Sequence, residues 1–140
     1  MSRYFDIKEL VCPHVLAVHG NKSWQFLDSR LIQTLDTIRE RINRPIFVNI
    51  GNLKQRGLRC IQCDLTKAKI EAGELYLSAH LFGKAADFDV QGIESEVMRL
   101  WLAKNANFLP WPIRLESGVS WVHLDMFPSF TGQKVCIFRP

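Results

Sequence analysis

An apolar stripe at helical spacing marks the most regular stretch of the chain, at Leu31, Leu35, Ile38 and Ile42. Asp28 or Ser29 precedes this stripe and can cap a helix by accepting backbone N–H bonds. Pro45 lies just beyond it, in the run Asn-Arg-Pro, and closes the helix. The pattern therefore predicts one amphipathic helix over this stretch.

Shorter helices are predicted on both sides of it. Residues 5–11 have the pattern of a short helix that Pro13 stops. We expect residues 14–27 to be irregular, with three side chains packed inward: Trp24, Phe26 and Leu27. Another helix is predicted over residues 94–105, and its expected inner face consists of Val97, Leu100 and Trp101.

Strand patterns account for most of the remaining chain. The β-branched and aromatic run 46–50 predicts a strand that Gly51 closes, and four more strands are predicted at 85–90, 113–115, 121–127 and 135–138. The polar stretch 52–79 is too long for a simple connector, and part of it, near 65–71, is typical of a helix. Helices first and strands later favour an α+β fold, with a small, mostly antiparallel sheet and helices packed on one side.

Polar residues alternate with apolar ones in two of these strands. Asp87 and Asp89 share one face of the first strand, with Phe88 and Val90 on the other. In the second strand one face carries Trp121, His123 and Asp125, and the opposite face carries Val122, Leu124 and Met126. The alternation predicts that each strand buries its apolar face and turns its polar face to a cleft.

Two imidazoles and one carboxylate, His80, Asp87 and His123, have the chemistry of a three-ligand zinc set. Such a set leaves a fourth position for water, which separates a catalytic zinc from a closed structural one. Gly83 lies between the first two residues and permits a tight turn beside the metal. The alternative is that these histidines are structural residues held by hydrogen bonds.

Zinc hydrolysis also needs a carboxylate that moves a proton, and Glu116 is the candidate catalytic residue. The turn at Ser117 and Gly118 can return the chain toward the metal; an exposed glutamate at a turn is the alternative. Asp89 or Asp125 is a candidate to orient a ligating imidazole.

Arg56 and Arg59 are candidates for binding an anionic group of a substrate, because arginine grips a carboxylate through two parallel hydrogen bonds. The alternative interpretation is that both arginines are solvated residues of a loop. Ser78 is a third candidate substrate-binding residue.

Composition adds limits to this picture. The 140 residues fit one domain, and 47% hydrophobic with 23% charged residues is ordinary for a globular protein. No apolar run approaches the roughly 18 residues of a membrane span, and no secretory signal is visible, so we expect a cytoplasmic monomer without membrane contact. Release to an outside partner would need lysis or another export route. The net charge of +4 favours an anionic partner, but the scattered basic residues argue against nucleic acid.

The four cysteines are expected to be reduced thiols without a special role, at Cys12, Cys60, Cys63 and Cys136. Cys60 and Cys63 have the CxxC spacing of a zinc knuckle or a redox pair. A redox motif should open a helix beside a βαβ unit, whereas this one is expected in a polar loop. A second zinc site is an alternative in which Cys12 and His14 supply the other two ligands. His14 and His19 are otherwise expected to be structural or exposed.

The frame Ser78-x-His80-x-x-Gly83-x-Ala85-x-Asp87-Phe88, followed by Trp121-Val122-His123, resembles the signature of the zinc D-Ala-D-Ala carboxypeptidase family. The start of the chain around residues 5–12 and the strand at 45–49 are also similar to that family, so the resemblance covers residues 5 to 127. It implies the Hedgehog/DD-peptidase fold, with His80, Asp87 and His123 as ligands of a zinc ion. It also implies a metallopeptidase of the D,D-carboxypeptidase or endopeptidase type that cleaves peptidoglycan stem peptides.

Two departures from that pattern bear on activity. Many members hold the catalytic carboxylate three residues before the last histidine, where this chain has Ser120; others hold a glutamate about six residues before it, close to Glu116. Many members also have an arginine in the turn after the first strand, where this chain has residues 50–53, Ile-Gly-Asn-Leu. Two alternatives therefore remain: a non-catalytic zinc-containing binding module of the same fold, and an enzyme of the same metal chemistry that acts on an amide outside the cell wall.

Overall fold

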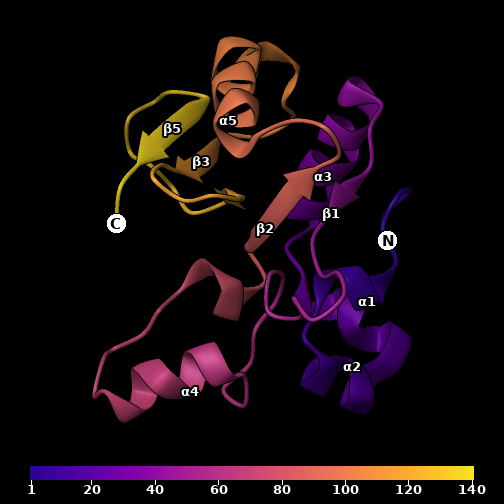
Figure 1. Cartoon of the computed structure of the whole chain (residues 1–140), viewed down its shortest axis with the longest axis vertical. Coiled ribbons are helices and arrows are strands. Elements are labelled where there is room, and N and C mark those ends of the chain that lie inside the picture. Colours follow the sequence, from indigo (N-terminus) through magenta and orange to yellow (C-terminus); the bar gives the residue numbers. More distant parts are fainter.

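The computed structural model describes residues 1–140 and has an α+β architecture built on one five-stranded sheet (Figure 1). The strands lie in the order β1 (Ile46–Phe47), β2 (Ala85–Val90), β4 (Val122–Asp125), β3 (Ile113–Glu116) and β5 (Val135–Phe138). All neighbours pair antiparallel except β3 and β5, which are parallel. The predicted α+β class and mostly antiparallel sheet are confirmed.

Strand β1 is shorter than the predicted run 46–50. It pairs with β2 only at Ile46 and Phe47. The chain then leaves the sheet, because the backbone N–H of Asn49 donates to the Glu9 carbonyl at 3.0 Å. This contact turns the following loop toward the N-terminal segment.

The predicted amphipathic helix is α3 (Ser29–Ile42), and the Asp28 carboxylate caps it by accepting from the Arg30 N–H at 2.9 Å. Helix α5 (Ser95–Lys104) also forms, but of its predicted inner face only Trp101 packs against the core. Val97 and Leu100 are 55% and 57% exposed, whereas Met98 and Leu102 are buried. The helix has apolar side chains around its whole circumference, so periodicity alone does not select the face that meets the sheet.

The N-terminal region is more helical than its sequence pattern predicts. After α1 (Ile7–Leu10), Pro13 opens a second helix, α2 (Pro13–His19), which continues into the 3₁₀ helix η1 (Gly20–Phe26). Proline suits the first turn of a helix because the N–H it lacks would have no partner there. Of the three side chains expected inside, Leu27 is buried, Trp24 packs against the core, and Phe26 is 38% exposed.

One hydrophobic cluster of 23 buried residues joins α1, α3 and α5 to one face of the sheet. The alternation in β2 and β4 is confirmed, since Phe88, Val122 and Leu124 are fully buried in this cluster. The opposite face carries Asp87 and His123.

No helix is both long and apolar enough to cross a bilayer.

The polar stretch between β1 and β2 contains helix α4 (Asp64–Glu71) and the 3₁₀ helix η2 (Ala79–Phe82); a further 3₁₀ helix, η3 (Ala106–Phe108), follows α5. Gly83 ends η2 with φ +64°, and a Cβ there would lie 1.9 Å from the Phe26 carbonyl oxygen. Only glycine fits this turn, which delivers the chain from His80 into β2.

The loop of residues 52–63 is attached to both the N-terminal segment and the sheet. The Leu58 N–H donates to the Leu10 carbonyl at 2.8 Å, and the Cys12 N–H donates to the Leu58 carbonyl at 2.9 Å. From the sheet, the Asp87 N–H donates to the Arg56 carbonyl at 2.7 Å. The loop therefore lies along the edge of β2 at Asp87, where β1 no longer pairs with it.

Candidate metal centre

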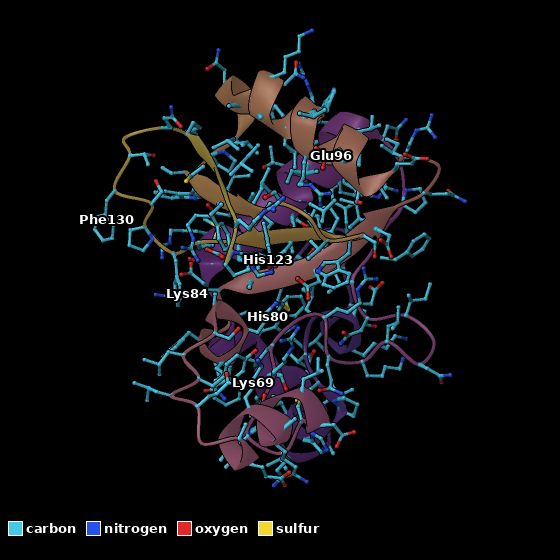
Figure 2. All side chains as sticks on the ribbon, turned by 60° about the vertical axis from the view of Figure 1, so that its left-hand side comes forward. Lys69, His80, Lys84, Glu96, His123 and Phe130 are labelled. Carbon is cyan, nitrogen blue, oxygen red and sulfur yellow. The ribbon has the colours of Figure 1, made fainter.

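Three separate elements bring His80, Asp87 and His123 together. His80 comes from η2, while Asp87 and His123 are direct partners across the antiparallel pair of β2 and β4. One ligand atom from each lies within 4.8 Å of the others, and the residues are only 3%, 5% and 8% exposed. Figure 2 shows both histidines where η2 meets the sheet. This group could hold a metal ion.

Both imidazoles face one oxygen of the central carboxylate. His123 Nδ1 donates to Asp87 Oδ1 at 2.7 Å, and His80 Nε2 lies 3.3 Å from the same oxygen. The far nitrogens are also held: His80 Nδ1 donates to the Gly57 carbonyl at 2.8 Å, and His123 Nε2 donates to Asp125 Oδ2 at 2.9 Å. An acceptor on the far nitrogen fixes the ring and decides which nitrogen faces the centre, as is usual for metal-ligating histidines.

Two arginines surround this centre from outside. Arg59 Nη2 lies 3.1 Å from Asp87 Oδ2, the oxygen that the imidazoles leave free. Arg114 grips Asp125 through two hydrogen bonds of 2.8 and 2.9 Å. The carboxylate that orients His123 is thus itself held in place.

The pKa values of the buried acids and of His123 are shifted by these contacts. Burial acts to raise the pKa of Asp87, but hydrogen bonds from His123 and His80 outweigh it and hold that pKa below its usual range. Burial acts to lower the pKa of His123, yet its bonds to Asp125 and Asp87 raise it to about 9. Asp125 behaves in the same way as Asp87. Burial acts to raise the pKa of Asp125, but hydrogen bonds from His123 and Arg114 outweigh it and lower that pKa. Without a metal, therefore, His123 is a cation between two carboxylates, and binding a metal through Nδ1 displaces a proton.

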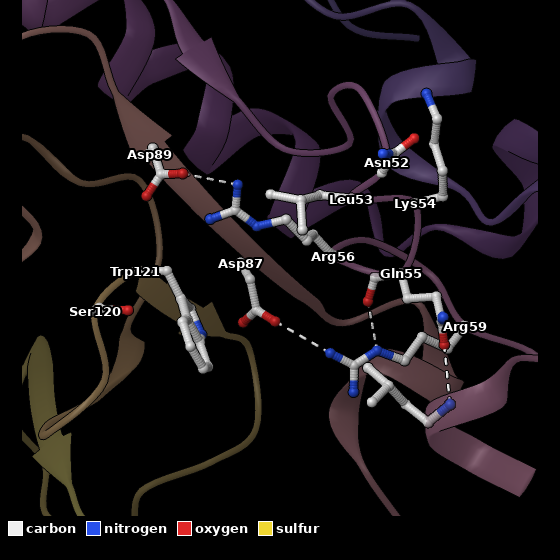
Figure 3. Close-up of a pocket in the computed structure, with 11 residues that line it drawn as sticks. Asn52, Leu53, Lys54, Gln55, Arg56, Arg59, Asp87, Asp89, Ser120 and Trp121 are labelled. Atoms are coloured by element: carbon white, nitrogen blue, oxygen red, sulfur yellow. Dashed lines mark hydrogen bonds and ion pairs between the residues drawn. The ribbon is translucent and has the colours of Figure 1, made fainter.

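A pocket of about 400 Å³ opens beside Asp87. Its walls come from the loop at 52–59, from β2 and from the end of the β3–β4 turn, and they include Leu53, Ser120 and Trp121 (Figure 3). The carboxylate of Asp87 lies between the Trp121 ring and Arg59 in this view. The predicted cleft along the polar face of β2 is therefore present.

Both arginines predicted to bind substrate line this pocket, but each is already paired with a carboxylate. Arg59 contacts Asp87, and Arg56 Nη1 lies 2.8 Å from Asp89 Oδ2. Asp89 therefore differs from expectation, because it holds Arg56 and has no hydrogen bond to an imidazole. Asp125 alone takes the orienting position.

Ser78 also lies elsewhere than expected for a substrate-binding residue. Its hydroxyl oxygen caps η2 by accepting from the His80 N–H at 3.3 Å, and it does not line the pocket. A side chain that caps this short helix holds the backbone of His80.

Glu116 ends β3 and is half-buried. Arg114 pairs with Asp125 and Leu115 with Leu124, so one further step in this register sets Glu116 opposite His123. Residues opposite each other in an antiparallel pair have Cβ atoms about 4.5–5.5 Å apart and point to the same face. The Glu116 carboxylate has no hydrogen bond or ion pair with the rest of the chain, although its neighbours Arg114 and Ser117 do.

Another group that could hold a metal lies about the start of α2 and the start of α4, at Cys12, His14, Cys60 and Cys63. All four cysteines are free thiols as expected, and the alternative of a common site brings together three of them, while Cys136 lies apart. The CxxC segment lies in a loop as expected, and its last residue, Cys63, is the N-cap of α4. His14 is exposed as expected, and so is His19, which packs edge-on against Phe26.

Two contributors to the centre were not predicted. Arg114 shares the strand face of Glu116 two residues away, so strand alternation could have pointed to it. Gly57 acts through its carbonyl oxygen, which no side-chain pattern reveals.

No family model, no curated protein and no solved structure matches this chain. Support for a function of the centre therefore comes from the geometry of the chain's own side chains.

Proposed function

We propose that this protein is a zinc-dependent metallopeptidase that hydrolyses peptide bonds in peptidoglycan stem peptides, with the Hedgehog/DD-peptidase fold. The observation that carries the proposal is the convergence of His80, Asp87 and His123 beside an open pocket. Three protein donors with room for a fourth ligand are typical of catalytic zinc. The sequence resemblance adds the class of substrate.

The donor set fits zinc in its chemistry. Zinc accepts imidazole nitrogen and carboxylate oxygen, and the atoms that face one another are His80 Nε2, His123 Nδ1 and Asp87 Oδ1. When bound, zinc supplies Lewis acidity, which activates water and polarises a carbonyl at neutral pH. The far nitrogens of both imidazoles are already bonded to acceptors, as a zinc site of this kind requires.

The chain's own residues then divide the remaining work. In this proposal Glu116 takes a proton from the attacking water and passes it to the leaving amine. The register of β3 and β4 supports this, since it sets Glu116 beside His123. No other side chain forms a hydrogen bond or an ion pair with the Glu116 carboxylate. Asp125 keeps the ring of His123 oriented, and Arg59 keeps Asp87 in its rotamer.

The pocket supports a peptide substrate of mixed charge. Its walls offer the Trp121 ring for apolar contact, together with the ion pair of Arg56 and Asp89. A stem peptide carries both carboxylate and amine groups, and an existing ion pair can exchange partners with such a ligand. The net charge of +4 also favours an anionic wall polymer.

A non-catalytic zinc-containing module is the second candidate. Ser120 stands where many related peptidases have their catalytic carboxylate, and both pocket arginines are engaged by acids of the protein itself. Such a module would bind wall peptides without cutting them.

Digestion of defined stem peptides that end in D-Ala-D-Ala tests the proposal. We expect the zinc-loaded protein to release D-alanine or to cut the peptide, as seen by mass spectrometry, and the chelated protein to do neither. Binding without cleavage would favour the second candidate. Cleavage of other amides, with none of the stem peptides, would keep the metal chemistry and change the substrate.

A further inference from the structure

The cluster Cys12, His14, Cys60 and Cys63 is independent of the proposed peptidase chemistry. Its ligand atoms all lie within 4.8 Å of one another, although they come from segments about fifty residues apart. His14 Nδ1 lies 3.6 Å from Cys60 Sγ and 3.8 Å from Cys63 Sγ, and the two sulfurs are 4.0 Å apart.

These separations match the edges of a zinc tetrahedron. With Zn–S bonds of about 2.3 Å and Zn–N bonds of about 2.0–2.1 Å, adjacent sulfurs lie about 3.8 Å apart and a sulfur and a nitrogen about 3.6 Å apart. Three cysteines and one histidine form a closed set of four, which is the pattern of structural zinc.

The backbone around the CxxC turn also suits thiolates. The Gln62 N–H points to Cys60 Sγ and the Cys60 N–H to Cys63 Sγ, each at 3.4 Å. Hydrogen bonds from backbone N–H groups stabilise the charged form of sulfur, which is the form that binds metal. Cys12 and Cys63 are fully buried, whereas Cys60 is half-buried and His14 is exposed, so a metal can reach the cluster from the His14 side.

The cluster lies at the base of the loop that supports the candidate active site. Cys12 and Cys60 flank the two hydrogen bonds that attach this loop to the N-terminal segment through Leu58. The same loop supplies the Gly57 carbonyl that holds His80 and the Arg59 guanidinium that holds Asp87. A metal ion that joins the loop to the N-terminal segment would therefore hold both the Gly57 carbonyl and the Arg59 guanidinium in place.

We propose that Cys12, His14, Cys60 and Cys63 bind a second, structural zinc ion, which fastens the loop at 52–63 to the N-terminal segment. This zinc has no open position and takes no part in hydrolysis. Its role is to hold Gly57 and Arg59 against the His80 and Asp87 side chains.

Metal analysis of the full chain and its variants tests this assignment. We expect about two zinc ions per wild-type chain and about one in each of two variants, His123→Ala and Cys60→Ser/Cys63→Ser. Cys136→Ser is the matched control, because this cysteine lies outside the cluster, and it should keep both ions. The His123→Ala protein distinguishes the two proposals, since its remaining ion does not depend on peptidase activity.

Two measurements need no cysteine variant and remain informative if that variant fails to fold. Cobalt-substituted His123→Ala protein should show a thiolate-to-cobalt charge-transfer band. Zinc should protect Cys12, Cys60 and Cys63 of the wild type from alkylation, relative to chelated protein, and leave Cys136 unaffected. Absence of the cobalt band with equal alkylation in both states, or a Cys60–Cys63 disulfide in zinc-loaded protein, would overturn the proposal.

Discussion

Two groups of side chains could each hold a metal ion, and they are built in different ways. The group of His80, Asp87 and His123 has three donors, two of them on paired strands, and it borders a pocket. The group of Cys12, His14, Cys60 and Cys63 has four donors, all from the ends of short helices and a loop.

The two groups differ in how the rest of the chain holds their side chains in place. In the first group, sheet register alone sets Asp87 opposite His123, and a shell of hydrogen bonds orients the rings. In the second group, two backbone hydrogen bonds through Leu58 attach the loop to the N-terminal segment, and two further hydrogen bonds from Asn49 hold the chain just before it. A strand-based site is prepared before its metal arrives, whereas a loop-based site gains its rigidity from the metal itself. We therefore expect the first to serve chemistry and the second to serve stability.

The largest expected effect follows from removing a ligand of the three-donor group. His123→Ala should reduce stem-peptide hydrolysis by at least about 10³-fold, because the chemistry loses its metal. Circular dichroism should show an intact fold. His19→Ala is the control, since this exposed histidine lies in neither group. Retention of activity in the His123 variant would remove the three-donor group from catalysis.

Loss of the proton carrier should have the next largest effect. Glu116→Gln is expected to lower kcat by about 10²–10⁴-fold, the usual contribution of a general acid or base, with the zinc content unchanged. Glu71→Gln, at an exposed position of α4, should behave as wild type. Full activity in the Glu116 variant would exclude this residue from the mechanism.

The shell around the imidazoles should have a smaller effect. Asp125→Asn weakens the acceptor for His123 Nε2 and is expected to lower zinc affinity or activity about 10–100-fold. Asp89→Asn is the matched comparison, because Asp89 holds Arg56 rather than an imidazole. Competition with a chelator should separate the two variants; equal zinc affinities would mean that Asp125 does not orient the ring.

The smallest effect concerns the loop that connects both groups. A Cβ at position 57 would lie 2.1 Å from the Leu10 carbonyl oxygen, so Gly57→Ala must displace the loop from the N-terminal segment. We expect a loss of about 1–3 kcal/mol in the free energy of unfolding. Denaturant unfolding measures this loss, with Asn52→Ala as an exposed control on the same loop. An unchanged stability would show that the loop is not held tightly.

Local patterns predicted much of the fold, and ligand chemistry offered every member of both groups as a candidate. Alternation in β2 and β4 assigned Asp87 and His123 to the polar face, and the stripe with its Asp28 cap defined α3. Patterns failed where apolar residues surround a helix, as in α5, because the chain itself has no preferred inner face there. They also failed at Pro13, which opens a helix where it was expected only to end one.

By itself the sequence determined which side chains share a face, since the two-residue repeat of a strand is a property of the local backbone. Only the tertiary structure decided which faces meet. Asp87 and His123 are 36 positions apart, and Cys60 and His14 are 46 apart, so their proximity depends on strand register and on how the loop packs against the N-terminal segment. The Gly57 carbonyl belongs to the same category, because a backbone oxygen acquires a partner only when the chain has folded around it.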